Sequence, residues 1–155
     1  MIDYDQILPD LYVGTYPETP EDIRELKNSC GVTAVLSLQS DEDLRDRGID
    51  CPAMEQSYKK LSIEVQRVPL RDFDPEDQRQ HLPEAVSALA GLLAAGHIVY
   101  LHCNAGTGRS PLVAMAYLHW HRKMDRKQAI KHVRDRRFSV PYEDLLKDGP
   151  KAGKP

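Results

Sequence analysis

Continuous apolar runs alternate with amphipathic segments along this chain, and the two patterns predict strands and helices in turn. Residues 32–38 (VTAVLSL) form an apolar run that is typical of a strand covered on both faces in a partly parallel sheet. Residues 97–103 (HIVYLHC) predict a second buried strand. Weaker alternation predicts two further strands, at residues 7–13 and 63–68.

Helices are predicted from apolar spacing and from residues that favour helix ends. Thr19 precedes Pro20 and two acidic residues, which starts a helix, and Gly31 ends it. Residues 82–95 carry apolar side chains at helical spacing and are followed by Gly96. Three more helices are predicted: a short one capped by Ser40, one at residues 111–123, and one at residues 126–136 capped by Asp125. The alternation predicts an α/β fold with a central, largely parallel sheet flanked by helices.

Length and composition are those of a single globular domain. The chain has 155 residues, of which 41% are hydrophobic and 29% charged. We expect one folded domain at residues 1–147 and a flexible C-terminal tail at residues 148–155. The net charge of −3 argues against general nucleic-acid binding. No apolar run approaches the ~20 residues that a membrane span needs, so we expect no membrane partner.

The cysteines indicate a reducing compartment. They are Cys30, Cys51 and Cys103, an odd number, and the acidic N-terminus MIDYDQILPD lacks the features of a secretion signal. We therefore expect a cytoplasmic protein with free thiols, acting as a monomer. No Cys/His cluster has the spacing of a zinc site, and we expect neither a metal nor another cofactor.

The stretch YLHCNAGTGRSP (residues 100–111) places Cys103 between a predicted strand and a predicted helix. Small residues let the backbone amides of such a loop point inward and form a nest for an anion, helped by the positive end of the following helix. Arg109 offers a planar fork for two phosphate oxygens. The same field favours the thiolate of Cys103, which becomes a nucleophile aimed at phosphorus. Ser110 can donate a hydrogen bond to the leaving thiolate, and His102 would orient the loop.

Cleavage of a phosphate ester also requires a general acid, and the polar stretch RDFDPEDQRQ (residues 71–80) is predicted to be the loop that carries it. Asp72 and Asp74 both qualify chemically. A single buried cysteine is more often a small packing residue than a nucleophile. The combination of Cys103, two loop glycines, Arg109 and an upstream acidic loop instead favours catalysis.

These residues resemble the signature of the cysteine-dependent phosphatases, His-Cys-x-x-Gly-x-x-Arg-Ser/Thr, and the short chain is similar to their dual-specificity branch. Within that branch it resembles the glucan phosphatases, over about residues 4–146. GHIVYLHCNAGTGRS is similar to laforin, whereas LPDLYVGTYPETPEDIRELK, VLSLQSDEDLRDRGID and RDFDPEDQRQHLPEAV are similar to the plant starch phosphatases.

The resemblance implies a role for each matching residue. Cys103 is the expected nucleophile, Arg109 the phosphate clamp, and Asp72 rather than Asp74 the general acid. Phe73 is expected to contact the substrate. The expected phosphate cradle consists of Asn104, Ala105, Gly106, Thr107 and Gly108.

The chain also departs from this family. Thr107 replaces a long apolar residue, and Asp46 and Arg47 occupy a stretch that is aromatic in the plant enzymes. Sugar rings bind largely by stacking on flat apolar surfaces, so such a loss weakens glucan binding. The remaining candidate platforms are Tyr4, Tyr12, Phe73 and Trp120, although Trp120 lies in an apolar helix and is interpreted as a core residue.

The expected reaction is hydrolysis of phosphate monoesters on a phosphorylated α-glucan, through a phosphocysteine intermediate. One alternative is a phosphoprotein phosphatase acting on phosphotyrosine and phosphoserine or phosphothreonine. Another is an inactive phosphate-recognition module, against which the complete set of catalytic residues argues. The basic cluster Arg134, Arg136 and Arg137 is interpreted as a solvated helix end.

Overall fold

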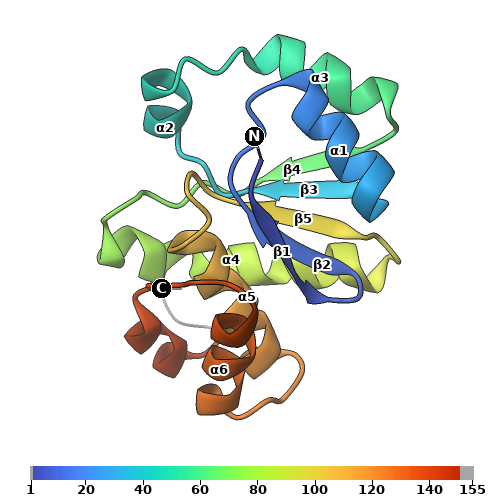
Figure 1. Ribbon diagram of the computed structural model, residues 1–155. Coiled ribbons are helices and arrows are strands. Elements are labelled where there is room, and N and C mark those ends of the chain that lie inside the picture. Colours follow the sequence, from blue (N-terminus) through green and yellow to red (C-terminus); the bar gives the residue numbers. More distant parts are fainter. Residues whose placement is uncertain (1, 151–155) are drawn as a thin grey trace.

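A five-stranded sheet forms the centre of the protein, whose computed structural model describes residues 2–150 (Figure 1). The strand order is β1-β2-β5-β3-β4. β2, β5, β3 and β4 run parallel, and only β1 is antiparallel to its neighbour β2. The strands are β1 (Tyr4–Leu8), β2 (Leu11–Gly14), β3 (Ala34–Ser37), β4 (Glu64–Arg67) and β5 (Val99–His102). The predicted α/β fold with a largely parallel sheet is confirmed.

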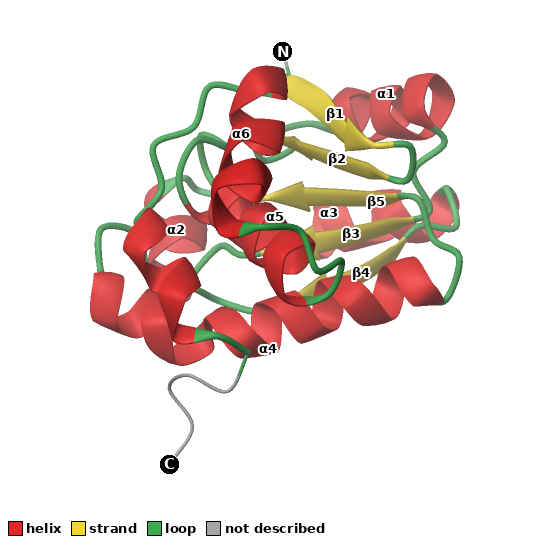
Figure 2. Ribbon diagram, turned by 90° about the horizontal axis from the view of Figure 1, so that it is seen from below, coloured by secondary structure: helices red, strands yellow, loops and turns green. Residues whose placement is uncertain are grey.

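Helices cover both faces of the sheet (Figure 2). α4, α5 and α6 lie on one face and α1 and α3 on the other, while α2 lies beyond the end of β3. The helices are α1 (Pro20–Cys30), α2 (Asp41–Asp46), α3 (Cys51–Lys60), α4 (Pro75–Ala94), α5 (Arg109–Trp120) and α6 (Arg126–Arg136), followed by the 3-10 helix η1 (Glu143–Asp148). None of the helices within residues 2–150 has the length and apolar character needed to cross a bilayer.

The two faces have separate hydrophobic cores of unequal size. The larger core packs α4 and α5 against the sheet and includes the central strand residue Leu101 and the helix residues Leu89 and Met115, all fully buried. The smaller core joins Ile23 and Leu26 of α1 to the other sheet face. α5 is buried along nearly its whole length, which fixes the position of the loop that leads into it.

Local signals placed several elements correctly. Thr19 caps α1 with a reciprocal capping box, and Gly31 ends this helix at φ +71°. Ser40 caps α2, and Asp125 caps α6. The expected helix at residues 111–123 begins two residues earlier, at Arg109, and ends at Trp120.

The single strand predicted at residues 7–13 is wrong. The segment is a hairpin of β1 and β2, turning at Pro9 and Asp10. Proline lacks the amide that a continuous strand would use for pairing, so it marks the turn. Only β2 reaches the interior of the sheet, where it pairs with β5.

The polar stretch at residues 71–80 is a loop only in its first half. α4 begins at Pro75, with Asp74 as its N-cap, and includes Pro83. Proline at the first helical position favours this start, whereas the apolar spacing on which the prediction rested begins only at Leu82. α3 and η1 were not predicted, and the tail prediction falls partly on residues 151–155, outside the described residues. Asp148, placed in that tail, ends η1 and pairs with Arg79 at 2.5 Å.

Four segments meet at the carboxyl edge of the parallel strands, where ligands bind in open α/β sheets. They follow β2, β3, β4 and β5. The segment after β4 carries the acidic residues Asp72 and Asp74, and the segment after β5 carries Cys103. The parallel topology therefore brings together residues that are far apart in the sequence.

Candidate active site

The cysteine loop, residues 103–108, connects β5 to α5 and surrounds a buried thiol. Cys103 is 3% exposed, and its Sγ lies 3.3 Å from the hydroxyl oxygen of Ser110. Gly106 has φ +72°, and a Cβ there would come within 2.5 Å of the backbone of Gly14. Only glycine fits this close approach between the loop and the end of β2.

The amides of this loop are free to bind an anion. Within the described part of the chain, none of the backbone N–H groups of residues 104–108 donates a hydrogen bond to a protein group. Free amides beside the N-terminus of α5 make a nest of positive potential around the thiol.

Arg109 is the largest buried polar side chain of the site. It is 1% exposed, and its Nη1 donates to the carboxylate of Asp43 at 2.6 Å and to the carbonyl of Leu70 at 2.8 Å. Its Nε is buried and has no hydrogen-bond partner among residues 2–150. A buried donor without a partner is costly unless a ligand satisfies it, and a phosphate oxygen is suited to do so.

Asp72 and Asp74, which the sequence left chemically equivalent, have different surroundings. Asp72 Oδ2 lies 3.3 Å from Arg109 Nη2, and the side chain is 35% exposed at the pocket. Asp74 instead accepts the amide of Asp77 at 3.0 Å as the N-cap of α4. Of the two carboxylates, that of Asp72 therefore lies within reach of a bound phosphate ester.

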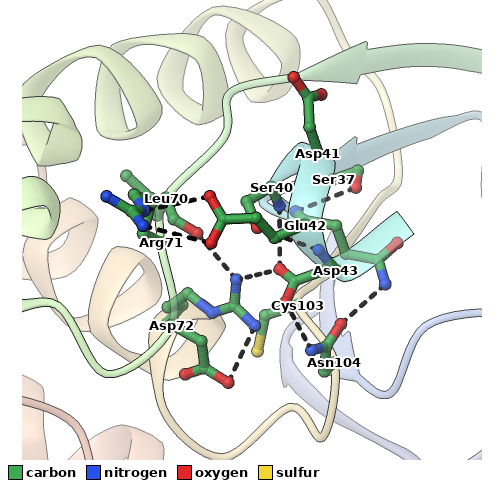
Figure 3. A network of polar contacts seen from close by, with 12 residues as sticks. Ser37, Ser40, Asp41, Glu42, Asp43, Leu70, Arg71, Asp72, Cys103 and Asn104 are labelled. Atoms are coloured by element: carbon green, nitrogen blue, oxygen red, sulfur yellow. Dashed lines mark hydrogen bonds and ion pairs between the residues drawn. The ribbon is translucent and has the colours of Figure 1, made fainter. Parts of the chain in front are cut away.

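Asp43 contacts Asn104 of the cysteine loop (Figure 3) and also binds Arg109, so it holds the two together. One carboxylate oxygen accepts from Arg109, and the other accepts from Asn104 Nδ2 at 3.0 Å. Asn104 Oδ1 in turn accepts from Gln39 Nε2 at 2.8 Å. Burial raises the pKa of Asp43, but hydrogen bonds from Arg109 and from the amide of Ser40 outweigh it and hold the pKa below its usual value.

His102 lies behind the loop. Burial, and secondarily the charge of Arg109, lower its pKa to about 4, so the ring is neutral near pH 7. Its Nδ1 lies 3.0 Å from the carbonyl oxygen of Cys103. Because a carbonyl can only accept, Nδ1 carries the proton and donates it to this bond. The ring thus contacts the loop through the backbone.

A pocket of about 260 Å³ opens above the thiol. Seven residues predicted for the site line it: Asp72, Phe73, Cys103, Ala105, Thr107, Gly108 and Arg109. Three predicted residues do not line it. Asn104 turns toward Gln39 and Asp43, Gly106 packs against Gly14, and Ser110 lies beneath the thiol.

Aromatic side chains are placed unevenly around the pocket. Phe73 stands at its rim, 85% exposed and at φ +57°. Tyr142 also lines the pocket, from the segment that follows α6. The other suggested platforms lie elsewhere. Tyr4 and Tyr12 pack in or against the smaller core, and Trp120 is buried with its Nε1 donating to Leu146, as its core interpretation predicts.

The geometry combines a thiol, an arginine, a nest of amides and a carboxylate at one pocket, and comparison with known proteins agrees with it. Residues 11–146 match the family model "Dual specificity phosphatase, catalytic domain". The chain belongs to this family. Within residues 2–150, no group of three or more His, Cys, Asp or Glu side chains is arranged to hold a metal ion.

Individual relatives of this dual-specificity phosphatase domain include phosphoglucan phosphatases. The chain is 37% identical to the amyloplastic phosphoglucan phosphatase DSP4 of Castanea sativa over 94% of its own length and 39% of that protein. It is 35% identical to laforin of Mus musculus over 76% of its length and 38% of that protein. It thus spans about two fifths of each relative. The crystal structure of PTPMT1, at 23% identity, shares the fold with a TM-score of 0.75 over 94% of this chain and 90% of that one.

Sequence reasoning missed several residues of this site. Asp43 occupied an acidic stretch with no local sign of burial. Arg137, interpreted as solvated, is 5% exposed and donates from Nε to the carbonyl of Gly106 at 2.6 Å. The pocket lining from residues 140–142 was also missed, although Val140 donates its amide to the carbonyl of Thr107 at 2.7 Å.

Proposed function

We propose that this domain hydrolyses phosphate monoesters through a phosphocysteine intermediate and that its substrate is a phosphorylated α-glucan. The observation that carries the proposal is the set of loop amides around Cys103, which, like the neighbouring Nε of Arg109, have no partner in the part of the chain that the structure describes. Together they match the oxygens of a tetrahedral dianion. The thiol beneath them is positioned to attack phosphorus.

The chemistry follows in two steps. The thiolate of Cys103 forms a bond to phosphorus while the bond to the ester oxygen breaks, and Asp72 donates a proton to the departing alcohol. Asp72 then takes a proton from water as its oxygen attacks phosphorus and the sulfur–phosphorus bond breaks. Inorganic phosphate leaves, and the hydroxyl of Ser110 stabilises the returning thiolate. Residues 104–108 and Arg109 bind the phosphoryl oxygens throughout.

Two features favour a sugar polymer as the carrier of the phosphate. The relatives DSP4 and laforin match most of this chain, and the first is named a phosphoglucan phosphatase. The rim also presents an exposed aromatic ring, Phe73, with Tyr142 on the segment that follows α6. Exposed aromatic faces suit the stacking of sugar rings.

The test compares phosphate release from phosphorylated amylopectin with release from a phosphotyrosine peptide at matched phosphate concentration. The Cys103→Ser protein is the blank. A higher rate on the glucan supports the proposal. A rate confined to the peptide would instead assign a protein phosphatase, and equal release by Cys103→Ser would rule out the cysteine mechanism.

We further propose that the domain acts as a monomer in the cytoplasm, in carbohydrate metabolism. The three cysteines Cys30, Cys51 and Cys103 are all free, which suits a reducing compartment. Sedimentation analysis and localisation of a fluorescent fusion of the protein test these two points. Fluorescence of the fusion in plastids would contradict the proposed cytoplasmic location.

A further inference from the structure

The backbone carbonyls of the cysteine loop, which face away from the thiol, are all hydrogen-bonded to the protein. Each of the six backbone carbonyls of residues 103–108 accepts a hydrogen bond from the surrounding protein, whereas the amides of residues 104–108 are left for a ligand. The pairs are Cys103 with the ring of His102, Asn104 with the amide of Tyr16, Ala105 and Gly106 with the guanidinium of Arg137, Thr107 with the amide of Val140, and Gly108 with the amide of Leu112.

Arg137 serves two of these carbonyls with one side chain. Its Nε donates to Gly106 at 2.6 Å, and its Nη2 donates to Ala105 at 3.2 Å. A peptide plane with its carbonyl held outward has its amide on the opposite side, toward the thiol. The planar fork of a guanidinium can hold two successive carbonyls in this way, whereas a single ammonium cannot do so with fixed geometry.

The guanidinium is itself fixed from the far end of the chain. Nη1 donates to Asp5 at 2.9 Å, and Nη2 lies 3.4 Å from the carboxylate of Asp3. The side chain of Arg137 is 4% exposed, while Asp5 is 43% exposed. A buried cation needs such partners, and here they come from β1 and the residue before it.

Packing leaves the guanidinium little freedom. A Cβ on Gly106 would lie 2.8 Å from Arg137 Nη2, so the loop and the side chain are in close contact. Among residues 2–150, the exposed side chain of Arg136, the neighbour of Arg137, bonds only within its own helix, to the carbonyl of His132 at 2.8 Å. The two adjacent arginines therefore have different surroundings.

We propose that Arg137 is a positioning residue of the phosphate site, which holds the carbonyls of Ala105 and Gly106 outward and so aims the loop amides at the bound phosphoryl group. This inference rests on the proposed phosphatase function. Arg137 touches neither the thiol nor the pocket, and it acts through the backbone of the loop.

The test compares Arg137→Met with Arg136→Met, which removes an equal charge one residue away. Affinity for inorganic phosphate is measured by calorimetry. The pH midpoint of iodoacetamide alkylation is followed by mass spectrometry of the peptide that carries Cys103. We expect Arg137→Met to bind phosphate at least tenfold more weakly and to shift the alkylation midpoint upward. Arg136→Met should match the wild type in both.

Two further variants keep the test decisive if Arg137→Met fails to fold. Arg137→Lys keeps the charge but not the planar fork, and Asp5→Asn loosens the guanidinium without removing it. Both should fall between wild type and Arg137→Met in phosphate affinity. Wild-type affinity and midpoint in whichever of these variants fold would overturn the positioning role. Phosphate release by the wild type is scored separately, so that a failure of the proposed function remains distinguishable.

Discussion

The guanidinium of Arg109 and the carboxylate of Asp43 lie 2.6 Å apart in the interior, joining the start of α5 to the first turn of α2. Asp43 also completes the capping box of α2, because the same carboxylate accepts the amide of Ser40 at 2.9 Å. The capping of a short helix and the orientation of the proposed phosphate clamp therefore depend on one side chain.

Asp43→Asn should weaken binding of phosphorylated substrate. An amide can replace only one accepting oxygen, and a hydrogen bond to a charged group contributes about 1.5–3 kcal/mol, so we expect KM to rise roughly tenfold to hundredfold. Steady-state kinetics with a small aryl phosphate measure this. Asp41→Asn, at a position 87% exposed on the same helix, is the control. An unchanged KM in Asp43→Asn would show that Arg109 is oriented without it.

Asp72→Asn should lose general acid catalysis, whereas Asp74→Asn should not. A positioned acid contributes roughly 100-fold or more, so kcat should fall by that factor. Asparagine caps a helix about as well as aspartate, so Asp74→Asn should keep α4 and the rate within about twofold of wild type. If the two variants behave in the opposite way, Asp74 is the acid.

Phe73→Gly should weaken the contact with glucan while leaving the stability of the fold nearly unchanged. A left-handed residue other than glycine costs about 1–2 kcal/mol, and relief of this strain offsets the flexibility of glycine in the unfolded chain. We expect the rate on phosphorylated amylopectin to fall roughly fivefold, as loss of about 1 kcal/mol of aromatic stacking predicts, with an unchanged rate on a small aryl phosphate. Phe138→Ala, which removes another exposed ring outside the pocket lining, is the control. Equal losses on both substrates would contradict a glucan contact.

The sequence carried those features of the fold and site that are local. The strand, the small-residue loop and the buried helix around Cys103 lie within about twenty residues, and their order alone predicted a thiol at a helix N-terminus. Caps at Thr19, Ser40 and Asp125 were equally local.

The partners of the cysteine loop could not be predicted in this way. Asp43 meets Arg109 across 66 positions, and Arg137 meets Gly106 across 31. Both belong to charged stretches that are typical of solvated helices. The burial of Asp43 depends on parallel strands that bring separate loops to one edge of the sheet. The burial of Arg137 depends on the packing of the end of α6 against β1 and the cysteine loop. Local sequence patterns contain no information on either contact.

The buried, neutral ring of His102 makes the free energy of unfolding depend on pH. Its pKa is about 4 in the folded protein and 6.5 in the unfolded chain, so between these values the unfolded state binds more protons. The stabilising contribution is therefore complete above pH 6.5 and is lost as the pH falls toward 4. For these two values the free energy of unfolding should decrease by about 2 kcal/mol between pH 7 and pH 5.

Urea unfolding at pH 7, 6 and 5 measures this decrease. His102→Asn offers an amide N–H where Nδ1 donates to the carbonyl of Cys103, but it cannot titrate, so most of the pH dependence should vanish in this variant. His121→Asn, on an exposed residue after α5, should retain the wild-type slope. The measurements stop at pH 5 because Asp43 would add a second loss of stability at more acidic pH. Its pKa is held below the usual value, so this loss begins only below pH 5. A slope that persists in His102→Asn would show that the buried ring is not the group that titrates.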